Sequence, residues 1–289
     1  MPDWRAIASQ LESAGRRVSL DMPPRTVSGG DISAAWRMSG SDGDVFVKTG
    51  PSTAAEQFSA EADGLSEIAA SHTICVPHVL ATGLAGEGAF LALDWLEFVP
   101  ADATTETLLG EHIAAMHACS AARFGWHRDN TIGLTPQCNQ QCDDWAEFFR
   151  EYRLRYQLQL AAKNGYQGTL QTRGEQLLQC LPKYFDSEAH KASLLHGDLW
   201  GGNWRCVGGQ PVVFDPAVYY GDRESDIAMT RLFGGFGRGF YEAYHAHWPR
   251  RDGHADRECL YQLYHVLNHL NLFGSSYLGR AVALIDQLL

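Results

Sequence analysis

The sequence has no long uninterrupted hydrophobic run, no low-complexity tract and no excess of basic residues. No apolar segment approaches the roughly 20 residues that a membrane-spanning helix needs. The opening MPDWRAIASQ lacks the basic and then apolar pattern of a signal peptide, so we expect a cytoplasmic protein. Lysine and arginine total 23 against 34 acidic residues, a formal net charge of −11. Because nucleic acids and anionic membranes require a basic surface, we expect neither as a partner, whereas a cationic small molecule is compatible with this charge.

Paired cysteines and metal-binding histidines are also scarce. The seven cysteines are odd in number and scattered along the chain, which is typical of a reduced interior and argues against a disulfide framework. Cys138 and Cys142 have the spacing of half a zinc site, but no second pair accompanies them. His265 and His269 lie four residues apart in HVLNH, yet the glutamate of H-E-x-x-H is missing. Neither pair predicts a metal site, and cleft-lining or hydrogen-bonded histidines are the simpler interpretation.

Hydrophobic periodicity divides the chain into a β-rich part and a helical part. The first part has amphipathic helices at 3–15 and 54–70, and β-prone stretches at 26–38, 44–50, 78–83 and 89–98. Later residues recur mainly at helical spacing, at 104–120, 142–163, 173–185 and three segments between 226 and 273, with short strands at 203–209 and 211–217. A chain of 289 residues is long enough for two lobes. We therefore predict an α+β fold with a small β-rich lobe at 1–97 and a larger, mainly helical lobe at 98–289.

The stretch LLHGDLWGGNW, residues 194–204, contains the spacing H-x-D-x-x-x-x-N of a kinase catalytic loop. In phosphoryl transfer the protein mainly orients the reactants and neutralises charge. Asp198 is the candidate that accepts the proton of the attacking hydroxyl. Asn203 and Asp215, the latter after the strand-like PVVF, offer the hard oxygen ligands that Mg²⁺ prefers. Each motif alone is common in turns, but the ordered set predicts a site for ATP and Mg²⁺.

An upstream lysine is the candidate for binding the nucleotide phosphates. Lys48 lies near the end of the strand-like DVFVKT, and the next helix carries Glu56 and Glu61, either of which could pair with it. We prefer Glu61, because it lies one helical turn from Phe58 and from Leu65, at the edge of the apolar face.

Two more segments complete the predicted nucleotide site. The turn SGGDIS places Gly29 and Gly30 before Lys48, where bare backbone N–H groups could approach a phosphate. The turn matches neither G-x-G-x-x-G nor G-x-x-x-x-G-K-[ST], so its position before Lys48 carries the prediction. In FLALDWLEF, the Asp94 carbonyl and the Leu96 amide are the candidates for contacting adenine.

The chain resembles the fructosamine kinase (ketosamine kinase) family, within the broader aminoglycoside-phosphotransferase-like kinases. The resemblance rests on four strings, which are LLHGDLWGGN, FDPAVYYGDRESDIAM, FGWHRDNTIGLTPQCN and YQLYHVLNHLNLFGSSY. It implies a protein-kinase-like fold and ATP-dependent phosphorylation of a sugar hydroxyl, on the third carbon of a ketoamine such as a fructosyl- or ribulosyl-amine. By the same resemblance Asp198 is the base, Asn203 and Asp215 bind the metal, and Lys48 pairs with Glu61. Residues 27–36 contain no cysteine, unlike the phosphate loop of some relatives, which argues against redox control there.

Four other residues carry secondary predictions. Trp200 and His269 are candidates for the walls of the substrate pocket, although packing would explain both. Asp226 resembles an aspartate that braces the catalytic loop through backbone hydrogen bonds. His117 is expected to be buried and hydrogen-bonded.

Two alternative functions stay open at this point. A kinase for an aminoglycoside or a choline-like amine would need the same phosphoryl-transfer residues. A nucleotide-binding module without catalysis would have lost at least one of Lys48, Asp198, Asn203 and Asp215, and all four are present.

Overall fold

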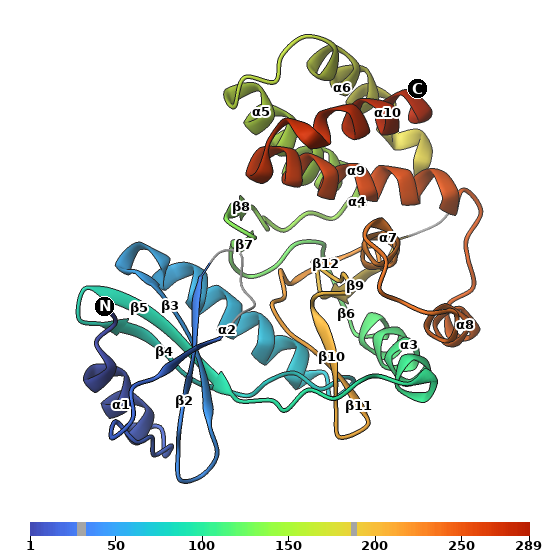
Figure 1. Ribbon diagram of the computed structural model, residues 1–289. Coiled ribbons are helices and arrows are strands. Elements are labelled where there is room, and N and C mark those ends of the chain that lie inside the picture. The colour runs from blue at the N-terminus through green and yellow to red at the C-terminus, as the bar shows by residue number, and fades with distance from the viewer. Residues whose placement is uncertain (28–32, 186–189) are drawn as a thin grey trace. The chain divides into compact units, whose positions relative to one another are not determined.

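The computed structural model describes residues 1–27, 33–185 and 190–289, and these divide into two compact units (Figure 1). Unit 1 contains Met1–Ala101 and Arg205–Pro216, and unit 2 contains Asp102–Trp204 and Ala217–Leu289. The prediction treated residues 98–289 as one lobe, whereas contacts in the structure group Arg205–Pro216 with the N-terminal residues. Within the described residues, no helix has both the length and the apolar character needed to cross a bilayer.

Unit 1 is built on a five-stranded antiparallel sheet with the strand order β1-β2-β3-β5-β4. Its strands are β1 (Arg25–Val27), β2 (Ala34–Met38), β3 (Val45–Pro51), β4 (Val79–Ala85) and β5 (Gly88–Asp94). Two helices, α1 (Trp4–Ser13) and α2 (Ala55–Ala70), and the short turn η1 (Ser52–Ala54) accompany the sheet. The β-prone stretches predicted before and after the helix at 54–70 are confirmed, the first two as β1 to β3 and the others as β4 and β5, although β5 ends at Asp94 instead of continuing to 98.

Strand β5 is buried on both faces because helices cover both. On β5, Phe90 belongs to an apolar cluster with Ile7 and Leu11 of α1, whereas Leu91 belongs to one with Phe58 and other residues of α2. Side chains alternate across a strand, so neighbouring residues contribute to different clusters. The run GAFLALD therefore reads as continuously apolar, as expected of a strand with no solvent-facing side.

Unit 2 is mainly helical. Its helices are α3 (Ala103–Ala118), α4 (Trp145–Phe149), α5 (Tyr156–Lys163), α6 (Thr169–Cys180), α7 (Glu224–Leu232), α8 (Arg238–His247), α9 (His254–Phe273) and α10 (Leu278–Leu288), with short turns η3 (Leu181–Tyr184) and η4 (Ser275–Tyr277). Helix α3 packs on α8, and α9 packs on both α7 and α10. The α+β fold class is confirmed by this division, but α10 had not been predicted.

The single long helix predicted for 142–163 is interrupted by a π-helical turn, η2 (Arg150–Arg155), between α4 and α5. The fully buried guanidinium of Arg153 lies in this turn and donates 2.6 Å and 2.7 Å hydrogen bonds to the Cys138 carbonyl and Asn139 Oδ1. The guanidinium carbon also lies 4.1 Å from the Tyr219 ring centroid. A π turn adds one residue to a helical turn. Here it coincides with Arg153, whose burial the apolar periodicity did not predict.

Short strands in unit 2 hold its loops in place. The antiparallel sheet β12-β9-β6 consists of β12 (Tyr219–Gly221), β9 (Ala192–Leu195) and β6 (Ser120–Ala121), and a hairpin joins β7 (Asn130–Ile132) to β8 (Thr135–Gln137). None of these strands had been predicted. The predicted pair β10 (Trp204–Val207) and β11 (Gln210–Val213) is confirmed, and apart from Trp204 its residues belong to unit 1.

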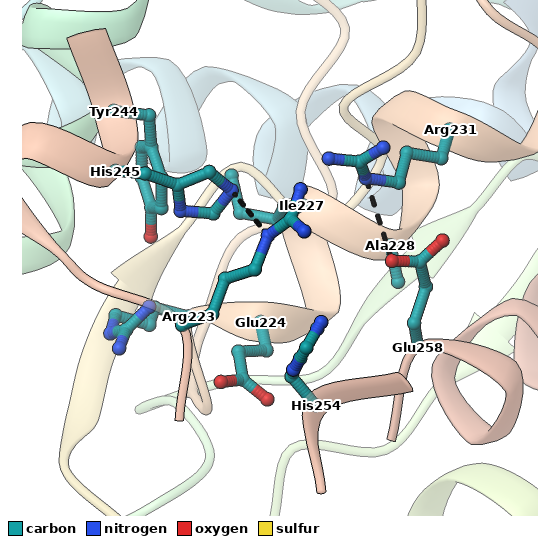
Figure 2. Close-up of a pocket in the computed structure, with 10 residues that line it drawn as sticks. Arg223, Glu224, Ile227, Ala228, Arg231, Tyr244, His245, His254 and Glu258 are labelled. Atoms are coloured by element: carbon teal, nitrogen blue, oxygen red, sulfur yellow. Dashed lines mark hydrogen bonds and ion pairs between the residues drawn. The ribbon is translucent and has the colours of Figure 1, made fainter. Parts of the chain in front are cut away.

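A pocket opens on unit 2 beside α7, α8 and the start of α9 (Figure 2). Its lining is mostly charged and aromatic, and consists of Arg223, Glu224, Ile227, Ala228, Arg231, Tyr244, His245, Arg250, His254 and Glu258. Arg231 pairs with Glu258 at 3.4 Å, and Arg250 donates to His245 Nε2 at 3.3 Å.

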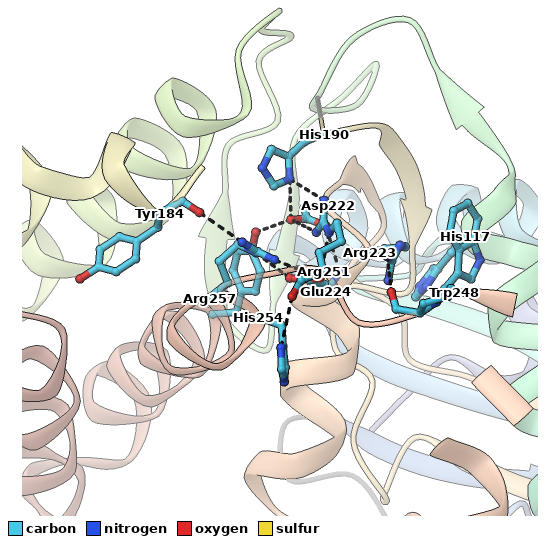
Figure 3. Close-up of polar contacts among 12 residues, drawn as sticks. His117, Tyr184, His190, Asp222, Arg223, Glu224, Trp248, Arg251, His254 and Arg257 are labelled. Atoms are coloured by element: carbon cyan, nitrogen blue, oxygen red, sulfur yellow. Dashed lines mark hydrogen bonds and ion pairs between the residues drawn. The ribbon is translucent and has the colours of Figure 1, made fainter. Parts of the chain in front are cut away.

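Beside this pocket lies a buried network of charged groups (Figure 3). The Asp222 carboxylate accepts hydrogen bonds from Arg251 Nη2 at 2.6 Å, from the Tyr261 hydroxyl at 2.6 Å and from His190 Nδ1 at 2.8 Å. Arg251 also donates to Glu224 at 2.8 Å. Burial would raise the pKa of the Asp222 carboxyl, but the His190 hydrogen bond and the charge of Arg251 outweigh it and hold the pKa far below its usual range.

Replacing Arg251 with Met should lower the free energy of unfolding by about 3–5 kcal/mol, because it leaves two buried carboxylates undercompensated. Urea denaturation at pH 7 measures this loss. The matched control is Arg238→Met, since Arg238 and Glu242 form a pair whose side chains are 89% and 60% exposed, and exposed pairs contribute only about 0.5 kcal/mol. Equal destabilisation by the two substitutions would contradict a stabilising role of the network.

Candidate active site

Lys48 is bound between two carboxylates inside unit 1. Its Nζ donates to Glu61 Oε1 and to Asp215 Oδ1, both at 2.7 Å. Alternation along β3 explains the first contact, because Val45 and Val47 pack in the cluster with α1, and Lys48 therefore lies on the opposite face, with α2. Glu61 reaches Lys48 from that helix, as preferred over Glu56. The contact with Asp215, 167 residues away in sequence, had not been predicted.

The two carboxylates keep Lys48 charged in spite of its burial. Burial alone would lower the pKa of Lys48, but the negative charges of Asp215 and Glu61 outweigh it and raise the pKa well above the usual value. Burial acts in the opposite sense on Glu61 and raises the pKa of its carboxyl, against the lowering effect of Lys48. A fixed ammonium in a partly desolvated position is suited to an anionic ligand, because its Coulomb energy is less screened than in water.

Asp215 has an unusual backbone conformation. It follows the buried strand β11 and the aromatic residue Phe214, which stacks on Phe98 with the ring centroids 5.7 Å apart. Its φ angle is +56°, a region that residues with a side chain enter at an energetic cost. Such strain persists only where neighbouring structure enforces it, and it is frequent at functional positions.

In unit 2, Asp226 fixes the backbone that leads to Asp198. Strand β9 delivers this backbone, and the amides of His196 and Gly197 donate to the two Asp226 carboxylate oxygens at 2.7 Å and 2.9 Å. His117, which is buried, lies 3.2 Å from Asp226 through Nε2 and 2.8 Å from the Tyr244 hydroxyl through Nδ1. The predicted bracing role of Asp226 and the predicted buried, hydrogen-bonded state of His117 are both confirmed.

The same contacts keep Asp226 ionised. Burial would raise the pKa of its carboxyl, but the hydrogen bond from His117, its charge and the Gly197 amide lower the pKa overall. A carboxylate that accepts two successive amides holds the peptide plane of residues 196 and 197 in one orientation.

The glycine at 197 is required by close packing. Its φ angle is +82°, and a Cβ built there would lie 2.0 Å from the Ala217 carbonyl oxygen, which no side chain could accommodate. The Ala217 amide in turn donates to the His196 carbonyl at 2.8 Å. Glycine therefore allows two backbone segments of unit 2 to approach each other at the start of the loop.

Asp198 and Asn203 are brought together by the loop that joins them. Asn203 Nδ2 lies 2.9 Å from the Asp198 carbonyl and 3.2 Å from Asp198 Oδ2. The Trp200 amide also donates to the Asp198 carbonyl at 3.1 Å, and the Asn203 amide donates to the Trp200 carbonyl at 2.9 Å. With Nδ2 directed at Asp198, the amide oxygen of Asn203 is the atom left to face another group.

Trp200 and His269 are joined through a third aromatic residue. Trp200 and Phe233 have ring centroids 6.4 Å apart, and Phe233 and His269 have centroids 4.8 Å apart. The His269 Nδ1–H donates to the His265 carbonyl at 2.8 Å, so Nε2 carries the lone pair of the neutral ring. Burial lowers the pKa of His269, which favours this neutral form. Phe233 was missed in the sequence, because no motif marks it.

The remaining predicted residues have different outcomes. Gly29 and Gly30 lie outside the described residues. Asp94 ends β5 opposite Val45 and pairs with Arg16 at 3.3 Å, and Leu96 lies in the segment that follows. None of the predicted site residues lines the pocket of Figure 2. Among the described residues, no group of three or more His, Cys, Asp or Glu side chains could hold a metal ion.

Comparisons with known proteins show similarity along nearly the whole chain. The sequence profile of the fructosamine kinase family matches residues 3–289. A probable ketoamine kinase from Synechocystis is 41% identical over 288 residues, covering 99% of this chain and 97% of its own. The chloroplastic protein-ribulosamine 3-kinase of Arabidopsis thaliana is 39% identical over 268 residues, covering 91% of this chain and 82% of its own.

A solved structure agrees with both sequence comparisons. The crystal structure of a presumed fructosamine-3-kinase from Haemophilus somnus matches with a TM-score of 0.92 at 30% identity, over 100% of this chain and 98% of its own. The two-unit α+β architecture is thus the protein-kinase-like fold predicted from the sequence. Since the profile and these relatives span nearly every residue of this sequence, the chain belongs to the fructosamine kinase family.

Proposed function

We propose that this protein transfers the γ-phosphate of ATP to the hydroxyl on the third carbon of a ketoamine, a sugar joined to an amine through its first carbon. The observation that carries the proposal is the loop from His196 to Asn203, which has the kinase spacing and is fixed through Asp226. Family membership across residues 3–289 supports a ketoamine over an aminoglycoside or choline-like acceptor.

Asp198 is the proposed general base. Its carboxylate would accept the proton of the sugar hydroxyl as that oxygen forms a bond to the γ-phosphorus. The bond from the γ-phosphorus to the bridging oxygen breaks, which releases ADP and leaves the phosphorylated ketoamine. Asn203 Nδ2 lies 3.2 Å from Asp198 Oδ2, and this contact holds the carboxylate in one orientation.

Lys48 is the proposed phosphate-binding residue for ATP. Its ammonium stays protonated at neutral pH and is aimed by Glu61, so it can offset phosphate charge without first being ordered. The Asp94 carbonyl and the Leu96 amide are the proposed adenine contacts, and Gly29 and Gly30 the proposed backbone approach to the phosphates.

Asn203 and Asp215 are the proposed ligands of Mg²⁺, and their donor atoms suit that ion. Asp215 Oδ1 receives Lys48, so Oδ2 is the carboxylate oxygen directed elsewhere, and the Asn203 side chain contributes an amide oxygen. Two hard oxygens are sufficient for an ion that also binds phosphate oxygens and water. When bound, Mg²⁺ would neutralise charge on the phosphates.

Trp200 and His269 are the proposed contacts for the sugar and its amine. The ketoamine nitrogen is a secondary ammonium, and the face of an aromatic ring attracts such a cation. The Nε2 lone pair of neutral His269 can accept a hydrogen bond from the ammonium or from a sugar hydroxyl. The acidic net charge of the chain is compatible with a cationic substrate.

The direct test is ATP consumption with fructosyl- and ribulosyl-amines, with the parent free sugars and an aminoglycoside as controls. We expect turnover of the amine adducts and little turnover of the free sugars, because those lack the ammonium. Equal rates on an adduct and its free sugar would show that the amine is not recognised. Turnover of the aminoglycoside alone would refute the proposal.

Asp198→Asn should reduce kcat by about 10²–10⁴-fold, the usual contribution of a general base, while ATP binding is retained. Steady-state kinetics and calorimetric titration with a nonhydrolysable ATP analogue measure the two effects separately. A variant that keeps near wild-type turnover would rule out Asp198 as the base.

Asp215→Ala should abolish Mg²⁺-dependent activity, because the ion loses its only anionic protein ligand in this scheme. Activity is measured across a Mg²⁺ titration, with Asp21→Ala, a substitution at an exposed position before β1, as the control. Superimposable Mg²⁺ curves for Asp215→Ala and wild type would show that Asp215 is not a ligand.

A further inference from the structure

Three exposed aromatic side chains of unit 2 form a row that begins at the loop containing Asp198. Trp200 is 39% exposed, Phe233 40% and Phe273 52%. Singly exposed apolar residues are ordinary on a protein surface, but these three are connected by ring contacts through His269. Connected exposed rings form a patch, and a patch of this kind is typical of a binding surface.

The outer part of this patch is an aromatic platform made of Phe233, Phe273 and Tyr277. The His269 ring lies 5.4 Å from the Phe273 centroid and 5.2 Å from that of Tyr277, and the centroids of Phe273 and Tyr277 are 6.5 Å apart. His269 and Phe273 are four residues apart on α9, which places both on one helical face.

Arg280 supplies a positive charge beside the platform. It lies on α10, and its Nη2 lies 3.5 Å from the carbonyl of Leu232, the residue before Phe233. Its side chain is exposed, and the described part of the chain places no carboxylate within ion-pair distance of it. The charge of Arg280 also contributes to lowering the pKa of His269, after the larger effect of burial.

We propose that the aromatic platform and Arg280 bind the substituent on the ketoamine nitrogen, and that they select an apolar substituent that carries a carboxylate. A sugar-modified free amino acid with an apolar side chain has this chemistry. The inference rests on the proposed function, because it assumes that the sugar hydroxyl binds at Asp198.

The order of the residues along the patch supports this assignment. Trp200 lies two residues after Asp198 and its amide donates to the Asp198 carbonyl, so the patch begins at the proposed base. Only a short carbon chain separates the third carbon of the sugar from the nitrogen, so the substituent begins near the inner rings and extends outward. The platform can then cover its apolar part, while a guanidinium is suited to bind a carboxylate through two parallel hydrogen bonds.

The charge at the platform distinguishes this class of substrate from a protein-bound one. A sugar on a lysine side chain presents methylene groups and then a peptide backbone, which carries no carboxylate. Such a substrate would gain from the rings but leave Arg280 without a partner. The described contacts therefore favour the free amino acid adduct.

The experiment compares two substrates that differ in one group, the fructosyl adduct of phenylalanine and that of phenethylamine, which lacks the carboxylate. For the wild-type protein we expect kcat/KM to be about 10-fold higher for the phenylalanine adduct, mainly through KM, because the group is remote from the reacting atoms. Arg280→Gln should remove this preference and change kcat/KM for the phenethylamine adduct by less than about twofold. Arg238→Gln, at an exposed arginine on α8, is the control and should keep the preference for the phenylalanine adduct.

Phe273→Ala tests the platform independently of the charge. It should lower kcat/KM by about 10-fold for both aromatic adducts and by much less for the glycine adduct, which has no side chain to cover the rings. Leu134→Ala, at another exposed apolar residue of unit 2, should leave all three values unchanged.

The outcomes separate this inference from the proposed function. Wild-type turnover of both adducts with equal kcat/KM, or an equal effect of Arg280→Gln on both, would overturn the inference and leave the proposed function intact. A preference for a fructosyl-lysine peptide over the phenylalanine adduct would also overturn it. Failure to phosphorylate any ketoamine would refute the proposed function and, with it, the inference.

Discussion

The geometry of the loop from His196 to Asn203 depends on one buried carboxylate. Asp226 accepts the amides of His196 and Gly197, and these two bonds fix the direction in which the chain leaves β9. Burying an ionised carboxyl is costly unless hydrogen bonds replace its hydration. His117 supplies a further contact and is itself held by Tyr244, so residues from α3, α7 and α8 all contribute to the position of one peptide plane. This arrangement fixes the backbone that leads into Asp198.

Unit 1 meets a related requirement with the opposite charge. Lys48 needs carboxylate partners in a partly desolvated position, and the structure gives it one from α2 and one from the segment after β11. In both units a carboxylate with little exposure, Glu61 beside Lys48 and Asp226 behind the loop that carries Asp198, positions a residue of the proposed site. The cost of burial is offset locally, and the side chains that would meet a substrate need little reordering when it binds.

The parts of the site that could be predicted are those governed by local periodicity or spacing. Lys48 follows from its place near the end of the strand-like DVFVKT, and Glu61 from its helical spacing with Phe58 and Leu65. The loop from His196 to Asn203 follows from its spacing together with the strand-like PVVF and Asp215 after it. The contact between Lys48 and Asp215 could not be derived in this way, because it joins residues 167 positions apart.

Other features could not be predicted from the sequence, and each has a physical reason. Strands of two to four residues, such as β6 and β9, are too short for alternation to be recognised. The π turn at Arg153 depends on contacts with Cys138 and Asn139 that the apolar pattern does not encode. The connected rings of Trp200 and Phe233 come from separate loops, and no spacing rule relates them.

Unit 1 is formed by two separate segments of the chain, and this affects how the protein can fold during its synthesis. Residues 1–101 leave the ribosome first, but Arg205–Pro216 belongs to the same unit and is synthesised only after residues 102–204. Backbone β-bridges join Val212 to Cys75 and Cys206 to Val99. Residues 1–101 therefore cannot make these contacts until Arg205–Pro216 has been synthesised. Asp215 arrives with it, and until then the nascent Lys48 has only one of its two carboxylate partners. Domains usually fold in the order in which they are translated, but here the N-terminal unit cannot be completed until most of the second has been made.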